Sequence, residues 1–265
     1  METKGFLEAL VSKKWRIRKD ALSWAIKEIG VYSLTPGTYG DVVLALRKSF
    51  LKDANVNVIG QAAILVSAPA SGLRGNLPPP AAKALTVDIL WRMKEKNKSE
   101  TGPMSNALDA LHINGCISIA ELKEEIVTAA SSKVPKARTM IFRWLDRCFA
   151  AGTRASDLKC PPLKLLGNVL TVGVGDATGD VRDAAFGAMA ALFVLVGERN
   201  FMPYIEKLDK VRTEKVLKMV KERPPPKRVA AAASASKASS LKAGAAKKGP
   251  PAKKGAPSQV PGKWL

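Results

Sequence analysis

Residues 162–196, PLKLLGNVLTVGVGDATGDVRDAAFGAMAALFVLV, contain one complete copy of the unit from which this chain is built. Apolar residues recur every three or four positions from Pro162 to Val174 and again from Asp180 to Val196. That spacing is typical of helices that bury one side. Between them, the stretch from Asp176 to Arg182 contains glycine and aspartate, which favour turns. The stretch therefore predicts a hairpin of two helices.

The same pattern extends over residues 1–222, where no run of residues alternates as a β-strand would. Helices are predicted at 4–11, 16–29, 38–51, 56–73, 79–93, 104–114, 119–130, 135–150, 162–174, 180–196, 202–208 and 213–221. They fall into pairs about 40 residues apart, which is the period of HEAT-type hairpins. We therefore predict an all-α fold, an α-solenoid of about six HEAT-like helical hairpins, each packed against its neighbours.

Each predicted pair encloses a short polar turn, here called an elbow, and stacking the pairs would align the elbows along one edge. The elbows are expected at 13–15, 53–55, 96–98, 133–136 and 176–182. In the first, Trp15 lies between Lys14 and Arg16, where no helical periodicity requires an indole. Exposed aromatic residues beside arginine are common interface anchors, so this edge is predicted to bind a partner. Three other tryptophans lie within helical patterns and are assigned to the core: Trp24, Trp91 and Trp144.

Charge indicates a strongly acidic partner. The chain has 43 Lys and Arg against 23 Asp and Glu, a net charge of +20, which suits nucleic acid, an anionic membrane or an acidic protein surface. Residues 223–265 carry ten basic residues and no acidic one among Ala, Pro, Ser and Gly, a composition that cannot build a core. We predict a folded domain at 1–222 and a disordered basic tail or linker at 223–265, which either binds polyanions or only solubilises the chain.

Other classes of protein are disfavoured. No apolar run is long enough to span a membrane, and the start, METKGFLEAL, lacks the apolar core of a signal peptide. The three cysteines, Cys116, Cys148 and Cys160, match neither a disulfide framework nor a zinc pattern, although His112 and Cys116 could share a helix face. We predict no metal, no cofactor and no enzymatic activity. Glutamates at 121, 124 and 125 are interpreted as a solvated helix start.

Several elbows carry a more specific pattern. The first reads Trp15-Arg16-Ile17-Arg18, and the second hairpin has Asp53-Ala54-Asn55 and later Gly72-Leu73-Arg74. The fourth gives Lys133-Val134-Pro135-Lys136 with Trp144-Leu145, and the fifth gives Asp180-Val181-Arg182. Over residues 5–221 these motifs resemble the TOG domains of the ch-TOG/Minispindles family of microtubule polymerases. One departure is the segment Lys98–Pro103, which is longer and more broken than the family's usual turn.

The resemblance implies a paddle of six HEAT-like units whose elbow edge binds the curved αβ-tubulin dimer. Expected contacts to β-tubulin are Trp15, Arg16 and Arg18, with Lys14, Asn55 and Lys96 beside them. Expected contacts toward α-tubulin are Lys133, Lys136 and Arg182, although Arg182 has bracing of the neighbouring repeat as an equal alternative. The tail would hold the domain near the acidic microtubule lattice through Lys227, Arg228, Lys247, Lys248, Lys253 and Lys254.

The implied location is the cytoplasm and its microtubules, including plus ends and the spindle or centrosome. Two alternatives remain from the residues alone. One is a helical-repeat protein that binds nucleic acid through its basic tail, which the elbow carboxylates Asp53, Asp176 and Asp180 argue against. The other is a passive scaffold that binds partner helices in grooves.

Overall fold

The computed structural model describes residues 3–31, 40–73, 77–93 and 98–226, which form paired helices with no strand among them. The pairs are α1 (Thr3–Leu10) with α2 (Trp15–Val31), α3 (Gly40–Lys52) with α4 (Val56–Leu73), α5 (Pro79–Arg92) with α6 (Lys98–Ile113), α7 (Lys123–Ala130) with α8 (Pro135–Ala150), α9 (Pro162–Gly173) with α10 (Gly179–Val196), and α11 (Glu198–Ile205) with α12 (Lys210–Glu222). A 3₁₀ helix, η1 (Ala155–Leu158), precedes α9. The predicted all-α solenoid of six hairpins is confirmed.

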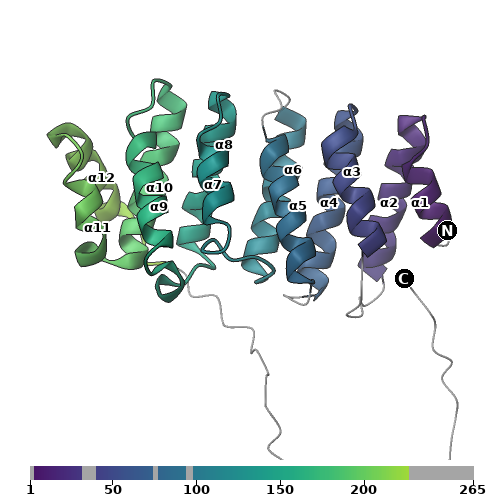
Figure 1. Cartoon of the computed structure of the whole chain (residues 1–265), viewed down its shortest axis with the longest axis horizontal. Coiled ribbons are helices and arrows are strands. Elements are labelled where there is room, and N and C mark those ends of the chain that lie inside the picture. Colours follow the sequence, from purple (N-terminus) through teal and green to yellow (C-terminus); the bar gives the residue numbers. More distant parts are fainter. Residues whose placement is uncertain (1–2, 32–39, 74–76, 94–97, 227–265) are drawn as a thin grey trace, which may run out of the picture. The chain divides into compact units, whose positions relative to one another are not determined.

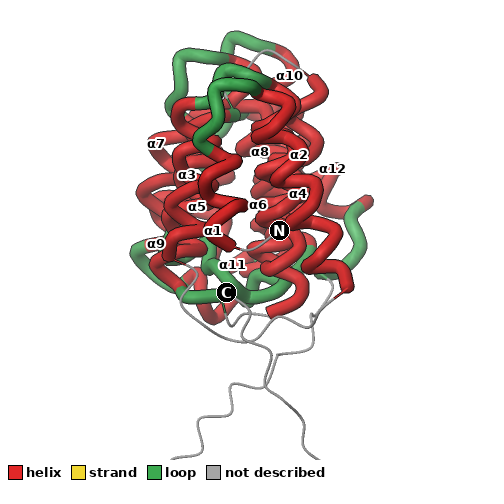
Figure 2. Tube along the Cα trace, turned by 90° about the vertical axis from the view of Figure 1, so that its right-hand side faces the viewer, coloured by secondary structure: helices red, strands yellow, loops and turns green. Residues whose placement is uncertain are grey.

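The pairs stand side by side in one row and form two layers (Figure 1; Figure 2). The first layer contains α1, α3, α5, α7 and α9, and the second contains α2, α4, α6, α8, α10 and α12. Within each layer a helix packs on the next helix of the same layer, as α4 does on α2 and α6. A single apolar core runs between the layers. Because the main contacts are between adjacent pairs, the body has the nearest-neighbour construction of a solenoid.

Local signals in the sequence set where the helices begin and end. Proline occupies the first turn of α5, α8 and α9, where its fixed φ suits the helix and its missing N–H removes no hydrogen bond. Gly197 follows α10 with φ +83°, which an L-residue with a side chain rarely adopts. Close packing requires glycine at position 173, because a Cβ there would lie 2.6 Å from the Phe142 ring. These features explain why the predicted limits of α5, α8, α9 and α10 agree with the observed ones to within one residue, whereas the predicted starts of α6, α7, α11 and α12 differ by three to six residues.

Two expectations are wrong. Lys98–Pro103 was expected to be a broken turn, but α6 begins at Lys98 and includes Pro103. The α6 helix packs along α4, with the Pro103 ring near Gly60, and this tertiary contact outweighs one lost backbone hydrogen bond. Trp91 was assigned to the core, but it is 56% exposed on α5. The other two assignments are better, since Trp144 is fully buried and Trp24 packs on Phe6.

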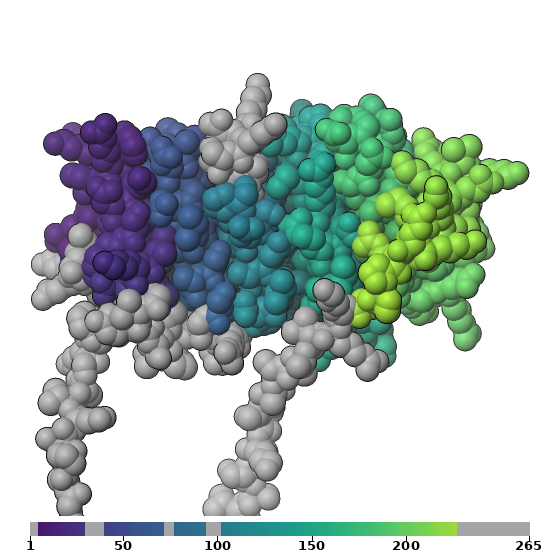
Figure 3. Space-filling view, turned by 180° about the vertical axis from the view of Figure 1, so that it is seen from behind, coloured from purple at the N-terminus to yellow at the C-terminus, as the bar shows by residue number. Residues whose placement is uncertain are grey.

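The chain does not leave the body at the end of α12. A four-residue segment, Arg223–Pro226, here called the strap, turns back over the second layer (Figure 3). The Arg223 guanidinium bonds the Asp146 carboxylate on α8. The bond passes over α10 at Gly187, where a Cβ would lie 2.9 Å from the carboxylate. These four residues, assigned above to the tail, therefore lie on the body. Where the tail begins beyond them remains a prediction.

The chain divides into one unit from Met1 to Ala230 and a second from Ala231 to Leu265, and all residues of the second unit lie outside the described ones. No helix in the described part of the chain is long and apolar enough to cross a bilayer.

We expect the strap to contribute to stability. A chain that ends after Pro226 should melt like the full chain, whereas one that ends after Glu222 should be less stable by about 1–2 kcal/mol, because it leaves Asp146 without its cation. For a body of this size each kilocalorie lowers the melting temperature by about 2–4 °C. Circular-dichroism melting of both truncations measures the difference. Equal melting temperatures would show that the strap contributes nothing.

Candidate functional site

The elbows of the hairpins lie along one edge of the row, the upper edge in Figure 1. We call this the elbow edge and define it by residues 11–14, 53–55, 93–97, 131–134, 174–178 and 206–209, with 94–97 outside the described residues. The opposite edge contains the connections between pairs. The predicted alignment of the within-pair turns is therefore present.

A short polar side chain fixes the backbone in four of these elbows. Ser12 and Ser132 each accept a hydrogen bond from the backbone N–H two residues later, at 3.3 Å. Asp53 and Asp176 make the same i to i+2 bond at 2.9 Å. Such bonds substitute for a backbone turn and stop the preceding helix from continuing. Each elbow thus has a defined shape before any contact with its neighbours.

Arginine then links adjacent elbows. The Arg18 guanidinium donates to both oxygens of Asp53, at 2.7 and 2.9 Å, and to the carbonyl of Ser12 at 2.7 Å. One guanidinium therefore holds its own elbow and the next one along the row. The bond to Asp53 is bidentate and partly buried, which is the strong form of this contact, and it raises the pKa of Arg18.

The same arrangement recurs between the fourth and fifth pairs. Arg138 donates to both oxygens of Asp176, at 2.8 and 2.9 Å, and to the carbonyl of Ser132 at 2.8 Å. Its hydrogen bonds lower the pKa of Asp176 below the ordinary 3.8. Both arginines are the fourth residue of the second helix of their pair. Sequence reasoning missed Arg138, although Arg at this position together with Ser or Asp six residues earlier was the available signal.

Arg182 is also a fourth residue, at the start of α10, and it braces its own elbow. Its guanidinium donates to the carbonyls of Asp176 and Ala177, at 2.8 and 2.9 Å. These bonds hold the elbow of its own pair, so they differ from the brace to the neighbouring repeat that was considered above for Arg182. Its contact with a partner remains a prediction, as does that of Arg18.

The predicted residues around Trp15 are more accessible. Trp15 is the first residue of α2 and is 37% exposed, with the Arg16 guanidinium 5.7 Å from the indole centroid. Lys14 and Arg16 are exposed. Asn55 is half-buried and caps the next helix by accepting the Asn57 N–H at 3.0 Å. An indole with a cation over it, at a rigid helix start, can desolvate a contact and pair with acidic groups around it.

The remaining predicted residues are spread out. At the fourth elbow Lys133 is exposed and Lys136 is half-buried, so the third elbow separates them from the Trp15 group. Seven predicted residues lie outside the described part of the chain: Lys96, Lys227, Arg228, Lys247, Lys248, Lys253 and Lys254. The structure therefore brings together one group at the first two elbows and a second group at the fourth and fifth.

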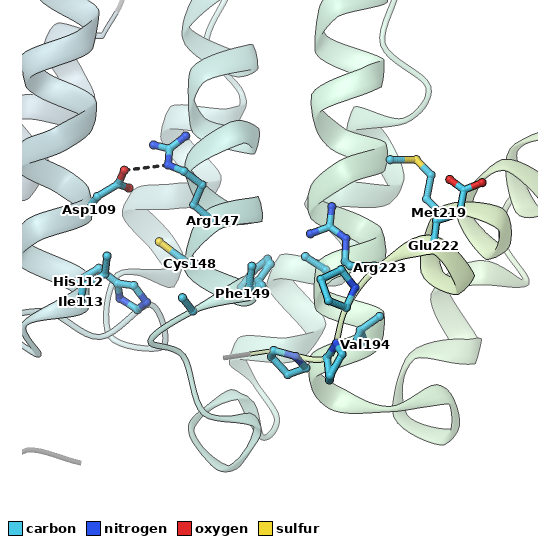
Figure 4. Close-up of a pocket in the computed structure, with 16 residues that line it drawn as sticks. Asp109, His112, Ile113, Arg147, Cys148, Phe149, Val194, Met219, Glu222 and Arg223 are labelled. Carbon is cyan, nitrogen blue, oxygen red and sulfur yellow. Dashed lines mark hydrogen bonds and ion pairs between the residues drawn. The ribbon is translucent and has the colours of Figure 1, made fainter. Parts of the chain in front are cut away.

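The structure also has a pocket on the second layer (Figure 4). It has a volume of about 620 Å³ and lies between α6, α8, α10, α12 and the strap. Asp109 and Arg147 are paired across its rim at 2.8 Å. Burial raises the pKa of the Cys148 thiol and lowers that of His112, whose Nε2 lies 3.1 Å from Thr153 Oγ1. The Cys148 thiol is therefore not activated as a nucleophile, because a reactive thiol needs a lowered pKa.

No protein-family model matches this chain. It is 32% identical over 220 residues to "Protein MOR1" of Arabidopsis thaliana, which covers 83% of this chain and 11% of the relative. It is 32% identical over 215 residues to "Spindle pole body component alp14" of Schizosaccharomyces pombe, a match that covers 79% of this chain and 26% of the relative. It is 28% identical over 214 residues to "Protein mini spindles" of Drosophila melanogaster, a match that covers 80% of this chain and 10% of the relative. The chain thus spans only a minor part of these relatives.

Solved structures share the fold. A chain from "Structural Basis of Microtubule Plus End Tracking by XMAP215, CLIP-170 and EB1" superposes with a TM-score of 0.80 at 27% identity, covering 86% of this chain and 94% of that one. A chain from "Structural Basis of Tubulin Recruitment and Assembly by Microtubule Polymerases with Tumor Overexpressed Gene (TOG) Domain Arrays" superposes with a TM-score of 0.74 at 26% identity, covering 83% of this chain and 46% of that one.

We expect removal of the Arg138 bridge to destabilise the body. Arg138→Gln should lower the free energy of unfolding by about 2 kcal/mol, because both groups are largely buried and Asp176 would keep no cation. Since Arg138 lowers the pKa of Asp176, the bridge stabilises above that carboxyl's ordinary pKa of 3.8, and its contribution is lost as pH falls through the folded-state value.

The measurement is denaturant unfolding of wild type and variant at several pH values. The matched control is Arg143→Gln, an exposed arginine of the same helix, which should change little. The bridge would be unimportant if both variants lost equal stability, or if the gap between wild type and Arg138→Gln did not shrink below about pH 4.

Proposed function

The described helical body is a TOG domain of the ch-TOG/Minispindles family, and from that premise we propose that the chain binds αβ-tubulin dimers through its elbow edge and regulates microtubule growth. The support from relatives is in their descriptions, which name microtubule plus-end tracking and tubulin recruitment. Because the chain spans about a tenth of the length of the plant relatives, their whole-protein activities come to it only as proposals.

The observation that carries this proposal is the exposed Trp15 side chain at the start of α2, close to the bond between Arg18 and Asp53. The indole is exposed at the start of α2, flanked by Lys14 and Arg16, and one helical turn from the Arg18–Asp53 bridge. This is where the family resemblance places the contact with β-tubulin. An exposed aromatic surrounded by cations suits an acidic protein surface, where the indole supplies apolar contact and the cations supply charge complementarity.

A rigid edge also suggests how binding is coupled to growth. The TOG domain would favour the curved dimer and release it when incorporation into the lattice straightens it, because the matching surface is then lost. The basic residues Lys227, Arg228, Lys247, Lys248, Lys253 and Lys254 would hold the domain near the lattice and raise the local concentration of dimer. Lys133, Lys136 and Arg182 would extend the contact toward α-tubulin, with Asn55 and Lys96 beside the Trp15 group.

The proposed activity is binding and requires no cofactor, metal or catalytic group. Its location would be the microtubule cytoskeleton, in keeping with relatives named for the spindle pole body and the centrosome. The nucleic-acid alternative finds no support among the relatives reported above.

Trp15→Ala should weaken tubulin binding by about 2 kcal/mol or more, the threshold of an interface hot spot. Size-exclusion chromatography with purified tubulin at moderate salt measures the complex, and circular-dichroism melting checks the fold. The control is Leu44→Ala, which removes an exposed apolar side chain of α3 away from the elbows. If Trp15→Ala instead lowers the melting temperature and leaves tubulin binding unchanged, the role of Trp15 is to pack the first two helices together.

Deletion of residues 227–265 should separate two kinds of binding. Association with polymerised microtubules should weaken and lose much of its salt dependence, because the deletion removes nine of the ten cations of 223–265. Binding to the soluble dimer should stay nearly the same, because the elbow edge and strap are retained. Co-sedimentation with microtubules and chromatography with soluble dimer give the two readings. Loss of soluble-dimer binding would contradict this division.

A further inference from the structure

Trp91 stands out among the exposed side chains. It is 56% exposed and is the second-to-last residue of α5, beside the third elbow. Large aromatic side chains contribute most of their stabilising free energy when buried, and more than half of the Trp91 surface remains exposed to solvent. Exposed aromatic residues that gather with other apolar groups are typical of protein interfaces.

Other apolar side chains are exposed along the same edge. Leu51, the second-to-last residue of α3, is 43% exposed, and Val172, the second-to-last residue of α9, is 77% exposed. Val11 and Trp15 add two more at the first elbow. Apolar groups are thus exposed at several elbows, where the neighbouring surface is otherwise polar and basic.

Asp53 bonds both helix ends that carry the exposed indoles. Its carboxylate is held by Arg18, one turn after Trp15, and its carbonyl accepts a 2.7 Å bond from Arg92, the residue that follows Trp91. One residue of the second elbow therefore fixes the helix start that carries Trp15 and the helix end that carries Trp91. Anchors held in place before binding lose less conformational freedom on association.

We propose that Trp91, with Leu51 on the neighbouring helix end, is a second apolar anchor of the elbow edge that contacts the same tubulin dimer as Trp15. This inference rests on the proposed function and adds a residue that the elbow motifs do not contain. An acidic protein fits the surface better than nucleic acid does, because aliphatic groups such as Leu51 and Val172 offer no stacking face to a base while exposed Lys14 and Arg16 supply the cations.

The test measures the affinity of the full chain for fluorescently labelled tubulin dimer at low and moderate salt, with a circular-dichroism melt of each variant. Trp91→Ala should weaken binding about tenfold or more without changing the melt. Its loss should be similar at both salt concentrations, because it removes apolar contact, whereas the loss in Arg16→Ala should shrink as salt rises. Ile113→Ala, an exposed apolar change on α6 at the opposite edge, is the matched control and should leave affinity within about twofold.

The outcomes separate the two ideas. If Trp15→Ala weakens binding and Trp91→Ala does not, the second anchor is refuted and the proposed function stands. If the wild-type chain does not bind tubulin, both fail. If Trp91→Ala lowers the melting temperature, the affinity of Leu51→Ala for tubulin is the deciding measurement. An unchanged affinity in Leu51→Ala would refute the second anchor. The choice of partner would be overturned if the chain bound duplex DNA as tightly as tubulin and Trp91→Ala weakened both kinds of binding equally.

Discussion

A bidentate bond between an arginine and the aspartate of the next elbow is the contact on which the elbow edge depends. In a solenoid each pair is positioned mainly by its neighbours, so small slips between pairs would accumulate along the row. Arg18 with Asp53, and Arg138 with Asp176, restrict such slips, because a planar guanidinium meets a carboxylate in one geometry. Each arginine also binds a carbonyl of its own elbow, so that the turn and the spacing between turns are set together.

This frame changes how the basic residues of the edge are understood. Arg18 and Arg138 pair with elbow carboxylates, so their charge is largely used within the body, whereas Arg182 donates to two carbonyls of its own elbow. Lys14, Arg16 and Lys133 are exposed and remain available to an acidic partner. The body thus combines fixed arginines that shape the edge with exposed cations that complement charge. An edge held in this way would favour a partner of matching curvature, as proposed above for the tubulin dimer.

The far end of the row shows how tightly the second layer is packed. The α10 helix is buried along most of its length between α8, α9 and α12, and its run of Ala and Gly lets the neighbouring helices approach. Gly187 leaves room for the bond between Arg223 and Asp146, which secures the chain after α12. The strap therefore sets where the chain leaves the described body, on the second layer beside the ends of α6 and α8 that lie away from the elbow edge.

The sequence by itself determined the helices, their pairing and the elbow edge, because a period of 3.6 residues and turn-forming residues act locally and repeat with each hairpin. It also predicted that Trp15 is exposed, because the indole lies at the junction of turn and helix, where the apolar periodicity does not require a buried residue. Only the tertiary structure decided that Trp91 is exposed, that Pro103 lies within α6, and that Arg18 and Arg138 bond the aspartate of the next elbow. The reason is that each of these depends on which neighbouring helix or elbow lies beside the residue, and bonds between positions about 40 residues apart leave no periodic signal in the chain.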